Sequence, residues 1–165
     1  MPGMYFTCKG EKTTFEDIRD DDNKMVGFEK HIHVLAWKLG VSAPIDIITG
    51  KKTGRRNHKT LEIEKEISST SPLIFQALCR GEKIKEAKLT LHQTAQGGGE
   101  EVYYTISFED CQFVEFDQWR EHERSAADHG QLDHERFTMS FRKITHSEEI
   151  HKKMGDDDFS KLAST

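Results

Sequence analysis

Alternation of apolar and polar residues is the dominant pattern of this chain, and it predicts β-strands. In the segment TLEIEKEIS, Leu61, Ile63 and Ile67 alternate with glutamates, as expected for a strand with one face in the core and the other in water. Residues 84–94 and 102–108 alternate in the same way. The glycine-rich turn TAQGGGEE lies between them, so the two segments are expected to form a long hairpin.

Other segments predict strands through their content of β-branched and aromatic residues. These segments are residues 4–9, 31–44 and 136–144. The second of them reads as one long strand that stops at Pro44, and its apolar centre suggests contacts on both faces. In the third, the side chains expected to face the core are Phe137, Met139 and Phe141.

One segment departs from this pattern and predicts a short helix over about residues 72–80. Ser71 is a suitable N-cap, Pro72 suits the first helical turn, and Gly81 suits the residue after the last turn. A helix of this length is marginal in water, so it must pack against the rest of the protein. The arc expected to make that contact consists of Leu73, Phe75, Gln76, Leu78 and Cys79.

Phe113 and Val114 interrupt the alternation because two adjacent residues of a strand cannot face the same side. A β-bulge, or a strand that crosses from one sheet to another, would explain the change of phase. About seven strands and one helix predict a mainly β fold, a two-sheet antiparallel β-barrel or sandwich. We expect one domain over residues 1–165, an extended loop at about residues 45–59, and a short flexible C-terminal tail at about residues 147–165.

Composition narrows the classes of partner. The 165 residues carry a net charge of −5, and 32% of them are charged, so a broad basic surface for nucleic acid is not expected. No apolar run approaches the roughly 18 residues of a membrane span, which argues against membrane insertion. Only 35% of the residues are hydrophobic, and such a chain can complete its burial against partner subunits.

The residue types that usually carry chemistry do not form a convincing site. His31 and His33 share one face of a strand, but a metal site needs three or four ligands. Cys79 and Cys111 both read as buried, and burial makes a thiol inert. The glycine spacing in GKKTGRR differs from that of a phosphate-binding loop. We therefore predict no catalytic residue, no cofactor and no metal, and a protein that is not an enzyme.

Charge is concentrated in two kinds of segment. The extended loop is basic through Lys51, Lys52, Arg55 and Arg56, whereas residues 20–22 and 156–158 are runs of aspartate. If these segments lie at opposite ends of the domain, identical copies could stack head to tail. Alternatively, each run only keeps its own loop solvated, which the pattern alone slightly favours.

Several segments in order resemble one known family. VLAWKLGVS, TSPLIFQALCRGEKIKEAKLTLHQT, EVYYTISFEDCQFVEF and FTMSFRKI are similar to the haemolysin-coregulated protein family, the tube subunit of bacterial type VI secretion systems. The resemblance implies hexameric rings that stack into a hollow tube, which a contractile sheath expels with a spike protein at its tip. It also implies that the lumen can carry effector proteins. The resemblance further implies a cytoplasmic protein that is then secreted to the medium or a target cell without a cleaved signal peptide.

The same resemblance assigns expected roles to individual residues. In the family, the extended loop reaches neighbouring subunits or rings, which makes its four basic residues the candidates for ring stacking. Lys38 points away from Trp37 and is the candidate for the lumen. The candidate acidic contacts are Asp20, Asp21 and Asp22. Two alternatives remain, a phage tail-tube-like protein and a monomeric ligand- or metal-binding β-barrel that uses His31 and His33.

Overall fold

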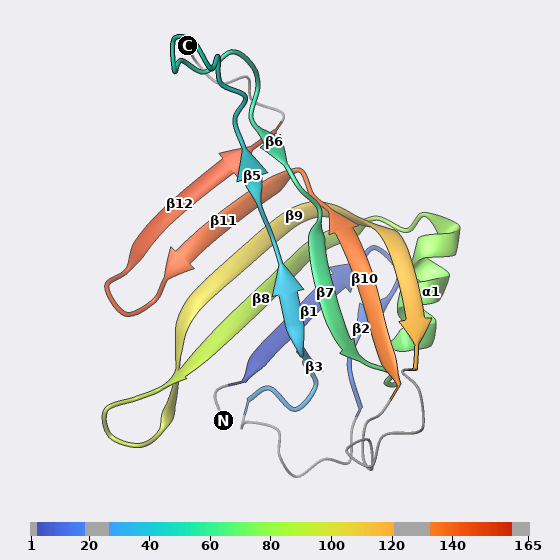
Figure 1. The fold of residues 1–165 in the computed structure, drawn as a ribbon. Coiled ribbons are helices and arrows are strands. Elements are labelled where there is room, and N and C mark those ends of the chain that lie inside the picture. The colour runs from blue at the N-terminus through green and yellow to red at the C-terminus, as the bar shows by residue number, and fades with distance from the viewer. Residues whose placement is uncertain (1–2, 19–26, 121–132, 160–165) are drawn as a thin grey trace.

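The structure is a computed structural model that describes residues 3–18, 27–120 and 133–159. Antiparallel strands and one helix make up the elements of these residues (Figure 1). In chain order they are β1 (Met4–Gly10), β2 (Thr14–Phe15), β3 (Ile32–His33), β4 (Ala36–Lys38), β5 (Val41–Ser42), β6 (Asn57–His58), β7 (Leu61–Glu66), α1 (Ser71–Arg80), β8 (Ile84–Thr94), β9 (Glu100–Trp119), β10 (His134–Ser140), β11 (Lys143–Glu148) and β12 (Lys153–Asp158). The predicted long hairpin is confirmed as β8 and β9.

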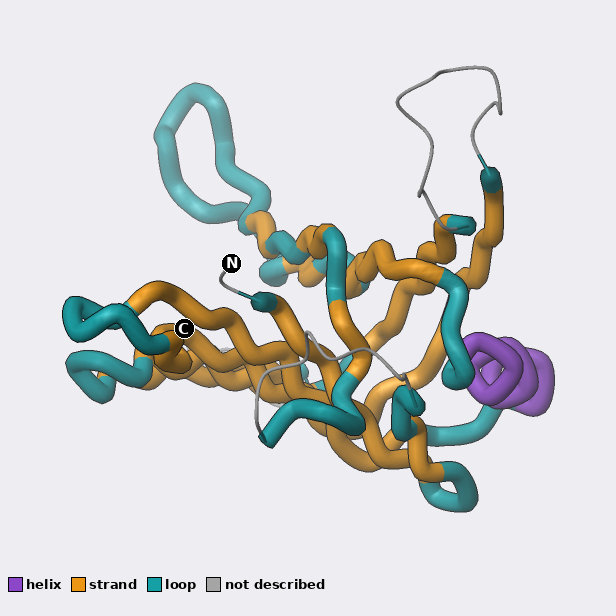
Figure 2. The backbone as a smooth tube through the Cα atoms, turned by 90° about the horizontal axis from the view of Figure 1, so that it is seen from below, coloured by secondary structure: helices purple, strands orange, loops and turns teal. Residues whose placement is uncertain are grey.

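The strands form two layers that share the 20-residue strand β9 (Figure 2). Through its first half β9 pairs with β8 and β11, and through its second half it pairs with β10. The first layer therefore has the order β2-β1-β8-β9-β11-β12, and the second has the order β9-β10-β7-β4. The change of layer follows Asp110, which has a left-handed backbone with a φ of 51°.

The second half of β9 contains the expected bulge. Glu115 lies opposite Thr138 and Phe113 lies opposite Met139, so Val114 is an extra residue on β9. Phe113 is 4% exposed in the core, whereas Val114 is 45% exposed. The bulge is thus confirmed as the explanation for the change of phase, whereas the crossing between the layers lies a few residues earlier, after Asp110.

The prediction of one long strand over residues 31–44 is wrong. The segment forms three short strands because its hydrogen-bond partners change. The backbone N–H of Val34 donates to Met4 in the first layer, and the N–H of the next residue, Leu35, donates to Glu64 in the second. The apolar centre of the segment reflects this crossing between layers. Among the described residues the ladder ends at β2 and at β4, so the two layers do not close into a barrel.

Helix α1 ends where the sequence predicted, but the side chains that it turns toward the core are not the predicted ones. Gly81 has a φ of 64°, and its N–H donates to the carbonyl of Leu78. The helix begins after Thr70 with no side-chain cap, so Ser71 is not the N-cap. Its buried residues are Ser71, Ile74 and Ala77.

The apolar arc predicted for the helix is therefore rotated from the observed one. Leu73 and Leu78 are partly buried against the core, whereas Cys79 is exposed. Phe75 is 55% exposed and packs its ring 5.9 Å from that of Phe116 on β9. The rotation brings Ser71 inward, where its hydroxyl forms hydrogen bonds with the buried side chains of Lys65 and Glu135.

Residues 147–159 do not form the flexible tail that we expected. Strand β12 pairs with β11 in six consecutive positions, from Lys143 opposite Asp158 to Glu148 opposite Lys153. The apolar pattern gave no sign of β12 because it is an exposed edge strand held through its backbone. Residues 160–165 of the predicted tail lie outside the described residues.

The core lies between the two layers. Phe137, Met139 and Phe141 face it as predicted. Ile67 does not, because β7 ends at Glu66 and Ile67 is 39% exposed. The hydrophobic core consists of Phe6, Cys8, Phe15, Ile32, Val34, Leu61, Ile63, Ile74, Ala77, Ile84, Ala87, Leu89, Leu91, Ile106, Phe108, Cys111, Phe113, Phe137, Met139, Phe141 and Ile144.

Candidate functional site: the extended loop and a buried polar network

The extended loop between β5 and β6 projects from the two layers (Figure 1). Its two arms are joined by the β5–β6 ladder, by a bridge between Ile45 and Lys52, and by a hydrogen bond from the N–H of Thr53 to the carbonyl of Pro44. The loop therefore has an ordered backbone.

The end of this loop is a tight turn organised by Asp46. The carboxylate of Asp46 accepts hydrogen bonds from the N–H of Ile48 at 2.9 Å and from the hydroxyl of Thr49 at 3.1 Å. These hydrogen bonds, that from Ile48 first, lower the pKa of Asp46. Gly50 completes the turn with a φ of 68°, and its N–H donates to the Asp46 carbonyl at 2.7 Å.

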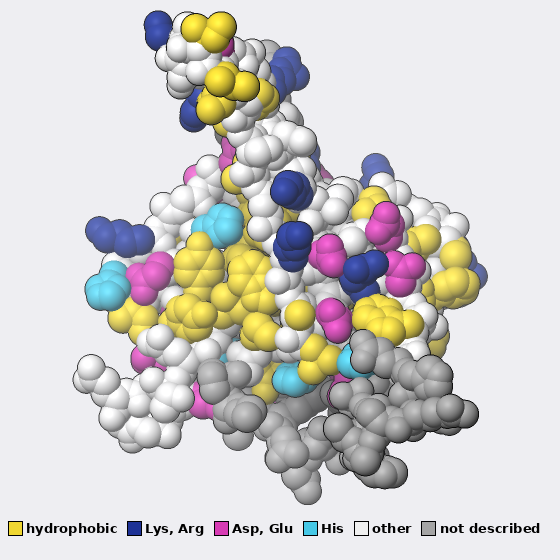
Figure 3. All heavy atoms as spheres, in the orientation of Figure 1, with side chains coloured by type: hydrophobic (Ala, Val, Ile, Leu, Met, Phe, Trp, Pro, Cys, Tyr) yellow, Lys and Arg dark blue, Asp and Glu magenta, His cyan; other side chains and the backbone are white. Residues whose placement is uncertain are grey.

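The turn presents apolar side chains to solvent. Ile47 is 95% exposed and Ile48 is 94% exposed. Figure 3 shows hydrophobic side chains gathered at the far end of the loop, with Lys and Arg side chains beside them. A built turn that displays two isoleucines away from the core is typical of a contact surface.

The four basic residues predicted for ring stacking divide into two groups. Lys51, Lys52 and Arg55 are exposed along the loop. Arg56 is half-buried at the base of the loop, where its Nε atom forms an ion pair with Asp157 of β12. Arg56 therefore already has an ion-pair partner within its own subunit.

The acidic run on β12 lies against the base of the basic loop. Asp157 also accepts a hydrogen bond from Nε2 of His58 at 2.7 Å, and the carboxylate of Asp158 accepts two hydrogen bonds from Arg142 at 2.7 and 2.8 Å. The idea that these opposite charges occupy opposite ends of the domain is thus wrong for β12. The other acidic run, Asp20, Asp21 and Asp22, lies outside the described residues.

Lys38 occupies the position expected for it on its strand. It is exposed on β4, and the neighbouring Trp37 packs against the core. Its cross-strand partner is Glu62 on β7.

The two histidines considered as metal ligands pack against aromatic rings. His31 packs its ring 4.8 Å from that of Phe28, and His33 packs near Tyr5. No three His, Cys, Asp or Glu side chains of residues 3–18, 27–120 and 133–159 group as metal ligands. Within the same residues no helix is long and apolar enough to cross a membrane.

Of the thiols, Cys111 is buried as predicted, whereas Cys79 is exposed. Burial raises the pKa of Cys111 to about 12. Burial first, and then the nearby Cys111 and Glu82, raise the pKa of Cys8 well above its usual value. Cys8 borders an open groove of about 440 Å³, yet a thiol with so high a pKa does not supply a thiolate there.

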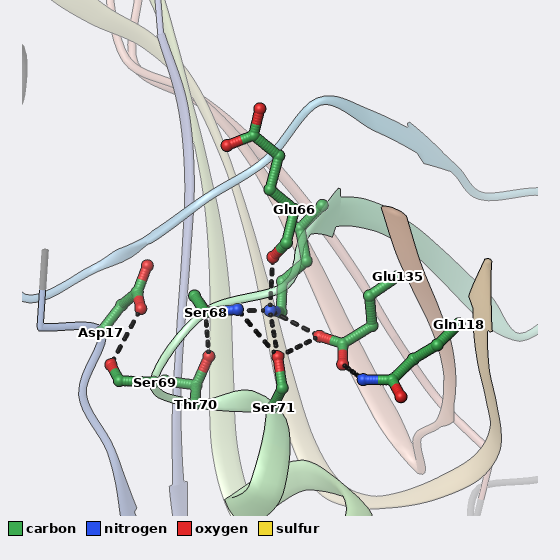
Figure 4. Close-up of polar contacts among 9 residues, drawn as sticks. Asp17, Glu66, Ser68, Ser69, Thr70, Ser71, Gln118 and Glu135 are labelled. Carbon is green, nitrogen blue, oxygen red and sulfur yellow. Dashed lines mark hydrogen bonds and ion pairs between the residues drawn. The ribbon is translucent and has the colours of Figure 1, made fainter. Parts of the chain in front are cut away.

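A buried polar network, which the sequence analysis did not predict, lies at the start of α1 (Figure 4). Lys65 of β7 and Glu135 of β10 are 1% and 0% exposed and form an ion pair, with Nζ and Oε2 separated by 2.5 Å. Lys65 also donates to the carbonyl of Glu66 and to the hydroxyls of Ser68 and Ser71 at 3.0 to 3.2 Å.

The remaining polar atoms of the network are also paired. The hydroxyl of Ser71 donates to Glu135 at 2.9 Å and accepts from the N–H of Ser68 at 3.0 Å, and Gln118 donates to the other oxygen of Glu135. The network therefore joins β7, β9, β10 and the helix start (Figure 4). Its burial keeps it away from any substrate, so its effect is to fix the position of α1 on the second layer.

Comparison with known proteins agrees with the fold and with the resemblance described above. A protein family described as "Type VI secretion system effector, Hcp" matches residues 14–147. A protein of Pseudomonas aeruginosa named "Major exported protein" is 31% identical over 134 residues, which make up 81% of this chain and 77% of that protein.

Solved structures share the fold at low sequence identity. The structure described as "Crystal structure of Hcp protein" has a TM-score of 0.89 at 20% identity, and the match covers 98% of this chain and 100% of that one. The structure described as "Secreted protein Hcp3 from Pseudomonas aeruginosa" has a TM-score of 0.75 at 22% identity and covers 96% and 99%. At these identities the likeness concerns the fold alone.

Proposed function

Because this chain belongs to the Hcp family of type VI secretion system proteins, we propose that it is a structural, self-assembling subunit of a secretion tube. Copies close into hexameric rings, and the rings stack into a hollow tube. The working part is the hole of the ring, and the protein needs no catalytic residue, cofactor or metal ion.

The observation that carries this proposal is the apolar end of the extended loop. Ile47 and Ile48 are almost fully exposed on a turn that hydrogen bonds hold in one conformation. Burying an isoleucine side chain stabilises a contact by roughly 1.5–3 kcal/mol, and a preformed turn loses little entropy when it docks. In a tube of identical subunits, the partner that covers this apolar end is a second copy of the chain.

Charges beside the apolar end support a heterologous contact between rings. Lys51, Lys52 and Arg55 extend from the loop without being drawn into the subunit, and residues 20–22 offer the complementary carboxylates. A contact between two different surfaces can repeat without end, as a tube requires. Lys38 is the candidate for the lumen wall because its face of β4 is turned from the core.

The proposal also covers the location of the subunit, its partner proteins and its cargo. The subunit resides in the cytoplasm before firing, and it then leaves for the medium or a target cell without a cleaved signal peptide. A contractile sheath and a tip spike are its partners outside the ring, and effector proteins are its cargo. The name of the Pseudomonas aeruginosa relative, "Major exported protein", supports the secreted step.

The oligomeric state of the purified full chain tests the ring. Light scattering combined with size-exclusion chromatography is expected to give the mass of a hexamer. Solitary molecules at every concentration and salt would overturn the proposal. A monomer that gains thermal stability with zinc would instead support the metal-binding barrel.

The contribution of the loop to stacking is tested by two variants in the hexamer. Ile47→Ser with Ile48→Ser removes the apolar end, and charge reversal to Glu at Lys51, Lys52 and Arg55 removes the cations. Both are expected to leave rings intact while the stacking of rings, seen by electron microscopy, falls.

The matched control is Lys153→Glu, which reverses one exposed charge on β12. Stacking should be unchanged in this control. In the native protein stacking should weaken at high salt, because salt screens the exposed charges of the loop. Normal stacking in both loop variants would exclude the loop as the contact.

A further inference from the structure

The internal hydrogen bonds of the extended loop do not fix its direction relative to the rest of the subunit. Strands β5 and β6 have two residues each, and a two-stranded ribbon is marginally stable alone. The N–H of Lys59 donates to the carbonyl of Gly40 at 2.8 Å, but this bond also joins one arm of the loop to the other. A link from the loop to a different element is needed to hold it at one angle.

Strand β12 supplies that link at the base of the loop. The carboxylate of Asp157 binds both Nε of Arg56 and Nε2 of His58, two residues apart on the returning arm. Arg56 also donates from Nη2 to the backbone carbonyl of Asp158 at 3.1 Å. One carboxylate therefore holds two side chains of the loop, and the neighbouring backbone holds one of them again.

Aromatic packing accompanies the charged contacts. The ring of His58 lies 4.2 Å from that of Phe159 and 6.0 Å from that of Phe141, which belongs to the core. The N–H of Phe159 donates to the carbonyl of Arg142 at 2.9 Å. The side chain of His58 is 9% exposed, so the loop base is packed as well as ion-paired.

The acidic end of β12 is itself anchored to the first layer. Arg142 binds Asp158 and also donates to Asp110 on β9 at 2.6 Å. A continuous series of contacts thus runs from the loop base through β12 to the point where β9 changes layer. In this series the carboxylate of Asp157 binds two side chains of the loop, those of Arg56 and His58.

We propose that Asp157 is a positioning residue that sets the angle at which the extended loop leaves the subunit. The inference builds on the proposed function, because a fixed angle matters where the loop must meet a second ring. The charge lost from Asp157→Asn weakens its bonds to Arg56 and His58, since a charge-assisted hydrogen bond is stronger than a neutral one.

The test measures the loop angle directly within one chain. Spin labels are placed at Ile48→Cys and Lys85→Cys, both exposed, in a Cys79→Ser background, and labelled chains are diluted with unlabelled ones. Electron spin resonance then gives the distribution of the distance between the labels. We expect a narrow distribution with Asp157 and one about twice as broad with Asp157→Asn, because the loop ribbon alone is marginally stable.

Three further variants make the test specific. Arg56→Gln, which removes the other partner, should broaden the distribution as Asp157→Asn does. Asp157→Glu should restore a narrow distribution, and Asp156→Asn should leave it unchanged, because Asp156 is exposed and makes no polar side-chain contact among the described residues. An unchanged width in both Asp157→Asn and Arg56→Gln would overturn the inference.

A second readout separates this inference from the proposed function. Asp157→Asn rings are expected to form normally and to stack less well than Asp156→Asn rings. If native chains never form rings, the proposed function fails while the label distances still decide the role of Asp157. If rings of Asp157→Asn stack as well as native rings despite a broad loop distribution, the fixed angle is not needed for stacking, and that part of the inference is overturned.

Discussion

Lys65 and Glu135 face each other across β7 and β10 as direct cross-strand partners, buried between the second layer and the start of α1. Removing two charges from water is costly, and their attraction offsets this cost only when the remaining polar atoms are also paired. Ser68, Ser71 and Gln118 provide those partners. The pair is therefore expected to matter most when one member is lost.

Loss of one member should strongly destabilise the subunit. Lys65→Met leaves the Glu135 carboxylate buried without a cation, and the free energy of unfolding should fall by about 3–5 kcal/mol. The double variant Lys65→Met with Glu135→Leu should be more stable than Lys65→Met alone, because no charge remains uncompensated. Urea unfolding at one fixed protein concentration measures both effects.

The control for this experiment is the exposed ion pair of Arg120 and Asp133, with side chains 60% and 36% exposed. Arg120→Met should change the unfolding midpoint little, because water screens an exposed pair. A Lys65→Met variant as stable as Arg120→Met would contradict the importance of burial.

The residue after α1 offers a test of backbone conformation. Gly81→Ala places a β-carbon at a φ of 64°, which should lower the free energy of unfolding by about 1–2 kcal/mol. Space is not the cause, because the nearest atom to such a β-carbon is 3.5 Å away on Gln112. Gly97→Ala, in an open turn without a positive φ, is the matched control and should be neutral in thermal unfolding.

The bulge in β9 predicts opposite outcomes for adjacent residues. Phe113→Ala should cost about 3–5 kcal/mol, because the side chain is 4% exposed and packs against Phe15 and Phe137. Val114→Thr, at 45% exposure, should leave the free energy of unfolding nearly unchanged. Chemical denaturation of both variants checks this, and similar losses at the two positions would place the bulge elsewhere.

Thiol reactivity should distinguish the three cysteines. In the folded protein one thiol per chain, that of the exposed Cys79, should react quickly with a thiol reagent at pH 8. Cys8 and Cys111 should react only after denaturation, because burial raises the pKa of each. Cys79→Ser should abolish the fast phase, and a fast phase that survives this substitution would show that a second thiol is accessible.

The raised pKa of Cys111 also predicts a loss of stability at high pH. An unfolded chain ionises this thiol above its ordinary pKa of 9.0, whereas the folded chain keeps the proton until about pH 12. The stabilising contribution is therefore complete below pH 9 and falls by about 1.4 kcal/mol per pH unit above it. Cys111→Ala should remove this part of the slope when unfolding free energies are compared from pH 8 to 10.5, and equal slopes would contradict it.

Local signals account for the features that the sequence predicted correctly. Gly81 ends the helix because the left-handed backbone favours glycine, and Phe113 next to Val114 reveals a bulge because alternation fails there. The resemblance to the family extended these signals to the whole fold. Each of these inferences depends on residues that are close together in the chain.

The missed features depend on contacts between distant segments. Residues 31–44 change partners between Val34 and Leu35, which alternation cannot show. The buried ion pair did leave a trace, because Lys65 continues the inward phase of Leu61 and Ile63. A buried lysine is expected to pair with a buried carboxylate, but only the fold shows that Glu135 is its partner.

The link between Arg56 and Asp157 joins residues that are 101 positions apart. At about 5–20 residues per second, a ribosome makes the loop some 5–20 s before it makes its anchor. A nascent chain therefore carries the extended loop without its anchor until Asp157 has been added. Chains that end before Asp157 would lack this anchor, so under the proposed function they would be selected against when rings stack.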